Sequence, residues 1–168
     1  EPEEKQKFSF KAISFSRISG LEEIYFGEDK DQLRLPSRNF SRQMKYEGTI
    51  PTIFYGKKVN VEGNEEFFPV ASTVIPKGLK NVILVFLASS RKDALTGRRF
   101  QVLHIDSDQA KFPGGGRHFL NLTGSDVSAT IGKQNVIVAA RSSNTFLPDS
   151  KTVSAGRVPV QIHSKQGT

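Results

Sequence analysis

The sequence predicts an all-β protein, an antiparallel β-sandwich of the immunoglobulin-like or Greek-key type. Short segments that are apolar, or that alternate between apolar and polar residues, recur along the 168 residues, and turns containing Gly or Pro separate them. No segment shows the apolar period of an amphipathic helix. Dinucleotide-binding and P-loop units therefore do not fit, since both need a helix after a strand. The strands are expected to form either one sandwich or two small packed β-subdomains.

The first half of the chain contains one long alternating segment and several shorter ones. Phe8, Phe10 and Ala12 share one parity, whereas Ile13 and Phe15 have the other. This change of phase predicts a strand interrupted by a β-bulge. Shorter strands are expected at residues 21–26, 33–35, 49–55 and 57–62, and a turn is expected at Gly63-Asn64.

The second half contains a buried strand and a hairpin. Residues 82–87 are apolar at both parities, which predicts a central strand buried on both faces. Residues 127–131 and 135–138 flank a short Gly-Lys-Gln segment, so they are expected to pair as a hairpin. Further strands are expected at residues 99–106, 118–122 and 158–163.

The polar N-terminal segment predicts where the domain begins, and the start of the chain bears on whether the protein is exported. Residues 1–7 are expected to form a polar tail before a sandwich domain at 8–168, with a sub-boundary near 91–97 if there are two subdomains. The chain opens without Met or an apolar signal core, so we expect an exported protein of the periplasm or cell surface whose signal peptide has been removed. The longest apolar run, residues 82–88, is far shorter than the ~20 residues that cross a bilayer.

The composition excludes several kinds of chemistry. The chain has no Cys and no Trp, which excludes disulfides, Cys-ligated zinc, cysteine catalysis and a Trp-lined binding platform. It has three His and no Gly-x-Ser-x-Gly segment, so nucleophilic catalysis has little support. We therefore expect a protein that is not an enzyme and that needs no cofactor.

The positive charge is concentrated in one part of the chain. The formal net charge is +7, and residues 32–58 carry six basic residues and one acidic residue. Within this region, residues 37–47 are the most polar stretch and are predicted to be a loop with at most one helical turn. A positive surface attracts anionic polymers, although a modest excess of Lys and Arg also simply keeps a β-protein soluble.

Six basic residues are candidates for a ligand-binding face: Arg38, Arg42, Lys57, Lys58, Arg98 and Arg99. Phe40, Tyr46 and Tyr55 are interleaved with them, and aromatic rings flanked by basic residues hold single-stranded nucleic acid on β-surfaces. Thirteen of the aromatic residues are Phe, however, and most have the apolar parity of a strand, which favours packing in the core.

One cluster of metal-ligating residue types is present. His104, Asp106 and Asp108 alternate along the chain, so they project from one face of an extended strand and could hold a divalent metal. A metal-dependent hydrolase is the function that this cluster would support. Asp108 also suits the turn that ends the strand, because Asp side chains bond to nearby backbone groups.

The segment Phe112-Pro-Gly-Gly-Gly-Arg-His-Phe-Leu-Asn-Leu-Thr123 resembles a pattern of uncharacterised exported bacterial β-proteins. Residues 76–83 and 127–132 fit the same resemblance, which covers residues 74–140. It implies a β-sandwich of the cell envelope without an assigned activity, and it assigns a role to no residue. The leading expectation is an exported, non-enzymatic interaction or structural module, whose partner is another envelope protein or an anionic polymer. A nucleic-acid-binding β-domain is the alternative.

Overall fold

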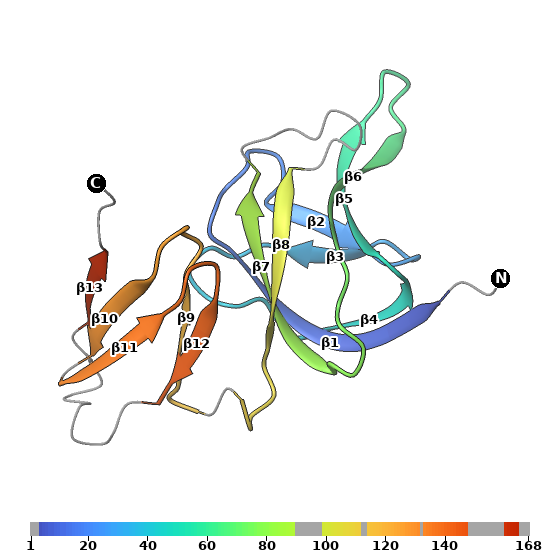
Figure 1. The fold of residues 1–168 in the computed structure, drawn as a ribbon. Coiled ribbons are helices and arrows are strands. Elements are labelled where there is room, and N and C mark those ends of the chain that lie inside the picture. Colours follow the sequence, from blue (N-terminus) through green and yellow to red (C-terminus); the bar gives the residue numbers. More distant parts are fainter. Residues whose placement is uncertain (1–3, 90–98, 112–113, 132, 148–159, 165–168) are drawn as a thin grey trace. The chain divides into compact units, whose positions relative to one another are not determined.

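The computed structural model describes residues 4–89, 99–111, 114–131, 133–147 and 160–164 (Figure 1). Within these ranges the regular structure consists of strands, which confirms the predicted all-β class. No helix there is long and apolar enough to span a membrane. The chain divides into two compact units, Glu1–Ser107 (unit 1) and Asp108–Thr168 (unit 2). The sub-boundary expected near residues 91–97 lies outside the described residues.

Unit 1 contains two four-stranded sheets, with the strand orders β4-β1-β7-β8 and β3-β2-β5-β6. The bounds of the strands are β1 Lys5–Ser14, β2 Glu23–Phe26, β3 Asp31–Arg34, β4 Met44–Thr49, β5 Thr52–Val59, β6 Glu65–Thr73, β7 Asn81–Ala88 and β8 Phe100–Asp106.

The first of these sheets is mixed. Strand β1 pairs with β4 in the antiparallel direction but with β7 in the parallel direction. The expectation of a purely antiparallel architecture is therefore wrong for this sheet. A parallel pair needs a crossover of a dozen or more residues, and the segment between β1 and β7 contains the whole of β2 to β6, so the connection is long enough.

Both sheets of unit 1 contribute side chains to one aromatic core. Phe10 of the first sheet packs against Phe26 and Phe54 of the second, with ring centroids 5.2 and 6.3 Å apart. Phe54 also packs edge-on against Phe86 of β7 at 5.1 Å. Strand β7 lies between β1 and β8, and its residues 82–86 are all buried, which confirms the predicted central strand. Phe15 is exposed, but six Phe residues are buried in this core: Phe8, Phe10, Phe26, Phe54, Phe86 and Phe100.

Two predictions that concern strand β1 differ from the structure. Strand β1 begins at Lys5, inside the segment expected as a tail, and pairs with β4 from that residue onward. Its buried positions alternate without a break as far as Ser14, so the predicted bulge is absent from this strand. Ser14 can occupy a buried position because its hydroxyl donates to the carbonyl oxygens of Ser16 and Phe86.

Unit 2 contains a three-stranded sheet, β11-β10-β13, and a two-stranded sheet, β12-β9. The predicted hairpin is confirmed, because β10 and β11 pair in the antiparallel direction. A small core is formed by Ile131, Val136 and Val138, with Phe119 and Phe146 packed against it. The bounds of the strands are β9 Arg117–Leu120, β10 Val127–Ile131, β11 Gln134–Val138, β12 Ser143–Phe146 and β13 Val160–Ser164.

Candidate functional site

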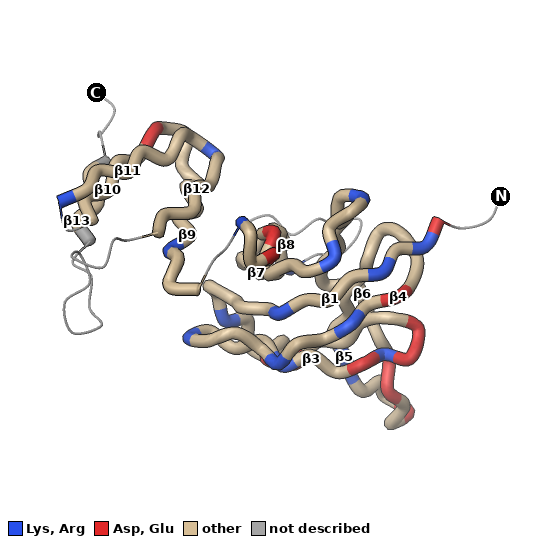
Figure 2. Tube along the Cα trace, turned by 90° about the horizontal axis from the view of Figure 1, so that it is seen from below, with Lys and Arg blue, Asp and Glu red and all other residues tan. Residues whose placement is uncertain are grey.

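Two of the predicted basic residues line the same cleft in the structure. Arg38 and Arg42 line one cleft in unit 1, whereas the lining contains neither Lys57, Lys58 nor Arg99. Arg98 lies outside the described residues. Within unit 1, Figure 2 shows Lys and Arg positions on several different strands and loops. Of the five candidates that the structure describes, Arg38 and Arg42 line the cleft.

Lys57 and Lys58 are engaged in ion pairs on the β5–β6 hairpin. The ammonium of Lys57 lies 2.8 Å from Glu65, and that of Lys58 lies 3.2 Å from Glu66. The hydrogen bond to Glu65 is the main reason why the pKa of Lys57 is raised. Asn60 and Lys58 both lower the pKa of Glu66 by hydrogen bonding to it. Each of these two lysines therefore has a carboxylate partner on the neighbouring strand of the hairpin.

The cleft is formed by the connection between β3 and β4, which is held to strand β1 at two places. The backbone N–H of Ser14 donates to Pro36 O, and the N–H of Ser41 donates to Ala12 O, each at 2.8 Å. The hydroxyl of Ser41 also accepts the N–H of Ala12 at 2.9 Å. Residues 38–40 lie between these attachments with exposed side chains.

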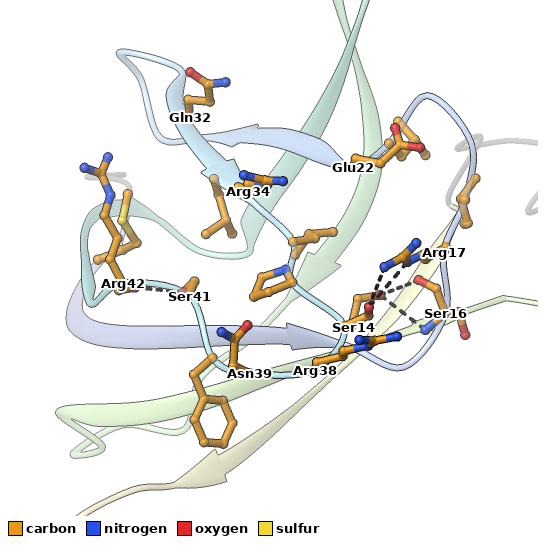
Figure 3. Close-up of a pocket in the computed structure, with 18 residues that line it drawn as sticks. Ser14, Ser16, Arg17, Glu22, Gln32, Arg34, Arg38, Asn39, Ser41 and Arg42 are labelled. Carbon is orange, nitrogen blue, oxygen red and sulfur yellow. Dashed lines mark hydrogen bonds between the residues drawn. The ribbon is translucent and has the colours of Figure 1, made fainter.

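Four arginines line this cleft, and we call it the arginine cleft. Arg17 follows β1, Arg34 ends β3, and Arg38 and Arg42 belong to the β3–β4 connection (Figure 3). Arg17 is fixed by two hydrogen bonds, from Nε and Nη2 to the Ser37 hydroxyl, at 3.3 and 3.2 Å.

The cleft is both positive and partly apolar. Glu22 is the one carboxylate among its described lining residues, and none of the ion pairs of the described chain involves the four arginines. Leu21, Leu33 and Met44 are buried at its base. The volume of the cleft is about 680 Å³, within the range typical of ligand-binding sites. Guanidinium groups form bidentate bonds to carboxylate or phosphate, and those of Arg34, Arg38 and Arg42 belong to exposed residues.

Phe40, Tyr46 and Tyr55, the aromatic residues interleaved with the basic ones in the sequence, lie in three different places in the structure. Phe40 is 46% exposed and is the one aromatic among the described residues that line the cleft. Tyr46 is buried in the core, and the ammonium of Lys30 lies over the ring of Tyr55 at 4.1 Å. The cleft therefore offers one ring for stacking rather than a row of rings.

The predicted metal ligands do not form a metal centre in the described part of the chain. His104 is an exposed residue of β8, Asp106 ends that strand, and Asp108 follows it. No group of three or more His, Asp or Glu side chains that could hold a metal occurs among the described residues. Asp108 accepts the backbone N–H of Ala110 at 3.1 Å, as expected for a residue of the turn after the strand.

Arg17 and Arg34 were not among the predicted site residues. Each is flanked by uncharged residues; Arg34 is one of the six basic residues of region 32–58, whereas Arg17 lies outside that region. Only the pairing of β3 with β2, and the attachment of the β3–β4 connection to β1, bring them beside Arg38 and Arg42.

No family model matches the chain, and no curated protein matches it in sequence.

Proposed function

We propose that this protein is a non-enzymatic β-sandwich module that binds an anionic polymer in the arginine cleft. The observation that carries the proposal is the set of four arginines, accompanied by a single carboxylate, around an open cleft with an apolar base. A cleft lined by an excess of positive charge raises the local concentration of an anionic ligand. The shared aromatic core of the two sheets in unit 1 supports the sandwich architecture.

We place the module at the bacterial cell envelope, as an exported protein. This part of the proposal is supported by the resemblance of residues 74–140 to exported β-proteins. Fractionation of cells that express the complete gene tests it. Recovery in the periplasm or at the cell surface is expected, and recovery in the cytosol alone would contradict it.

Binding to a panel of labelled polyanions tests the function of the cleft. The panel contains an acidic peptide, an acidic polysaccharide and a single-stranded oligonucleotide, each measured by fluorescence anisotropy at low and high salt. At least one is expected to bind the full chain with an affinity that decreases linearly with salt on a logarithmic scale. Absence of binding to every polymer at low salt would refute the proposal.

A pair of double variants locates the binding. Arg38→Gln with Arg42→Gln removes two guanidinium groups from the cleft, and Lys57→Gln with Lys58→Gln removes the same charge from the β5–β6 hairpin. Each exposed charged contact is worth up to about 1 kcal/mol, so the first variant is expected to weaken binding about tenfold. The second variant is expected to bind nearly as tightly as the unmodified protein. Equal losses in both would indicate attraction by net charge rather than by the cleft.

A further inference from the structure

One side of strand β3 has no partner strand among the described residues. β3 is the terminal strand of its sheet and pairs with β2 alone. The N–H of Leu35 donates to Glu22 O at 2.9 Å. Because hydrogen-bonding directions alternate along an antiparallel strand, Leu33 also faces β2, and the backbone groups of Gln32 and Arg34 face the opposite side. The N–H and C=O groups of these two residues are thus directed toward the unpaired edge.

This edge borders the arginine cleft. Gln32, Leu33 and Arg34 all belong to the lining, and Figure 3 shows β3 running along one side of the cleft with Arg38 and Arg42 on the connection across from it. An unpaired strand edge is a template for an additional strand. Recognition of extended peptides by addition to such an edge uses main-chain hydrogen bonds for affinity and side-chain sites for specificity.

The chemistry around the edge indicates which peptide would fit. Side chains of an added strand alternate between the two faces of the sheet. One set would meet the guanidinium groups of Arg34 and Arg42, and the other would lie over the apolar base that includes Leu33 and Met44. Acidic residues suit the first set and apolar residues the second. A nucleic acid would leave the backbone edge unused and would find one aromatic ring in the cleft, that of Phe40.

We propose that the arginine cleft captures an extended peptide in which acidic and apolar residues alternate, by adding it as a strand to the free edge of β3. The inference rests on the proposed function, because it names the class of anionic polymer that the same cleft binds. The guanidinium groups select the acidic side chains, and the main-chain hydrogen bonds of Gln32 and Arg34 fix the register. Slippage by one residue would place the acidic side chains over the apolar base.

Backbone methylation of a model peptide tests this mode of binding. The probe is a fluorescent eight-residue peptide of alternating Glu and Val, with two derivatives that are N-methylated either at every Glu or at every Val. Only one of these two sets of N–H groups can face β3. One derivative is therefore expected to bind at least tenfold more weakly than the parent, and the other to remain within about threefold.

Each outcome separates this inference from the function on which it rests. If both methylated derivatives bind like the parent, strand addition is refuted, although binding of an anionic polymer in the cleft would stand. If the oligonucleotide or the acidic polysaccharide binds and the parent peptide does not, the inference is overturned and the proposed function survives. If no polyanion binds, both are refuted. Arg34→Gln is expected to weaken binding of the parent peptide, with Lys57→Gln as the control that leaves it unchanged.

Discussion

Replacement of Ser41 by Ala tests how the arginine cleft is held together. The hydroxyl of Ser41 accepts the backbone N–H of Ala12 at 2.9 Å and donates to Arg42 O at 2.7 Å. Ala12 is fully buried, so Ser41→Ala leaves its N–H group without an acceptor. A buried donor that loses its partner costs about 1–3 kcal/mol. We expect the free energy of unfolding of unit 1 to fall by that amount.

Tyrosine fluorescence during denaturation with urea measures this effect. All three Tyr residues are in unit 1 and the chain has no Trp, so the signal reports on unit 1 alone. Ser37→Ala is the matched control, because the Ser37 hydroxyl accepts only exposed hydrogen bonds from Arg17. This control is expected to leave stability nearly unchanged, since such contacts compete with water.

Amide hydrogen exchange gives an independent measure of the same contact. In Ser41→Ala, the N–H of Ala12 is expected to exchange at least about fivefold faster, the factor that corresponds to 1 kcal/mol. If both the stability of unit 1 and the exchange of Ala12 are unchanged, the hydrogen bond between Ser41 and Ala12 does not stabilise the attachment of the cleft to β1.

Three further substitutions test the core and the pH dependence. Phe54 is fully buried, so Phe54→Ala is expected to destabilise unit 1 by about 3–5 kcal/mol in the same assay; a loss below 1 kcal/mol would contradict this packing. A Cβ on Gly56 would lie 2.6 Å from Phe68 and 2.8 Å from Leu21, so Gly56→Ala is expected to cost about 1–3 kcal/mol through overpacking, and unchanged stability would show that these side chains move aside. Burial lowers the pKa of His118 in the folded protein below the unfolded value of about 6.5. The free energy of unfolding that depends on neutral His118 is therefore complete above that value, and it is lost as the pH falls through the folded pKa. Thermal unfolding of unit 2 between pH 7 and pH 5 should show this loss, and His118→Gln should reduce it; an equal loss in the variant would refute the assignment.

Strands whose apolar residues follow one clear pattern were predictable from the sequence. The residues of β7 are apolar at both parities, and they form a strand buried between two neighbours. The β10–β11 hairpin follows equally directly from two apolar segments around a short turn. The parallel pairing of β1 with β7 could not be predicted, because it depends on a contact between segments far apart in the chain.

Strand β4 was missed because its polar residues concealed its pattern. It occupies part of the basic stretch that was predicted to be a loop, yet Met44, Tyr46 and Gly48 are buried at every second position. Charged residues between them face outward and dominate the local composition. Similarly, Ser14 continues the buried face of β1 although its side chain is polar, because two carbonyl oxygens accept its hydroxyl.

The candidate site was predictable only in part. Arg38 and Arg42 belong to a local concentration of basic residues, so the sequence alone indicated them. Lys57 and Lys58 belong to the same basic region of the sequence, residues 32–58, but their ion-pair partners, Glu65 and Glu66, come from the facing strand β6. Sequence proximity therefore overestimates a binding surface when a neighbouring strand supplies the opposite charge.

The most direct test of the central claim is to observe the guanidinium groups themselves while a ligand binds. Nitrogen-15 NMR of the arginine Nε–H signals, recorded as the acidic model peptide is added, is expected to show shifts for Arg17, Arg34, Arg38 and Arg42. The signals of Arg117 and Arg141, which are exposed residues of unit 2, are expected to stay in place. Shifts of similar size at all of these arginines, or none at the four that line the cleft, would contradict the claim that the cleft is the binding site.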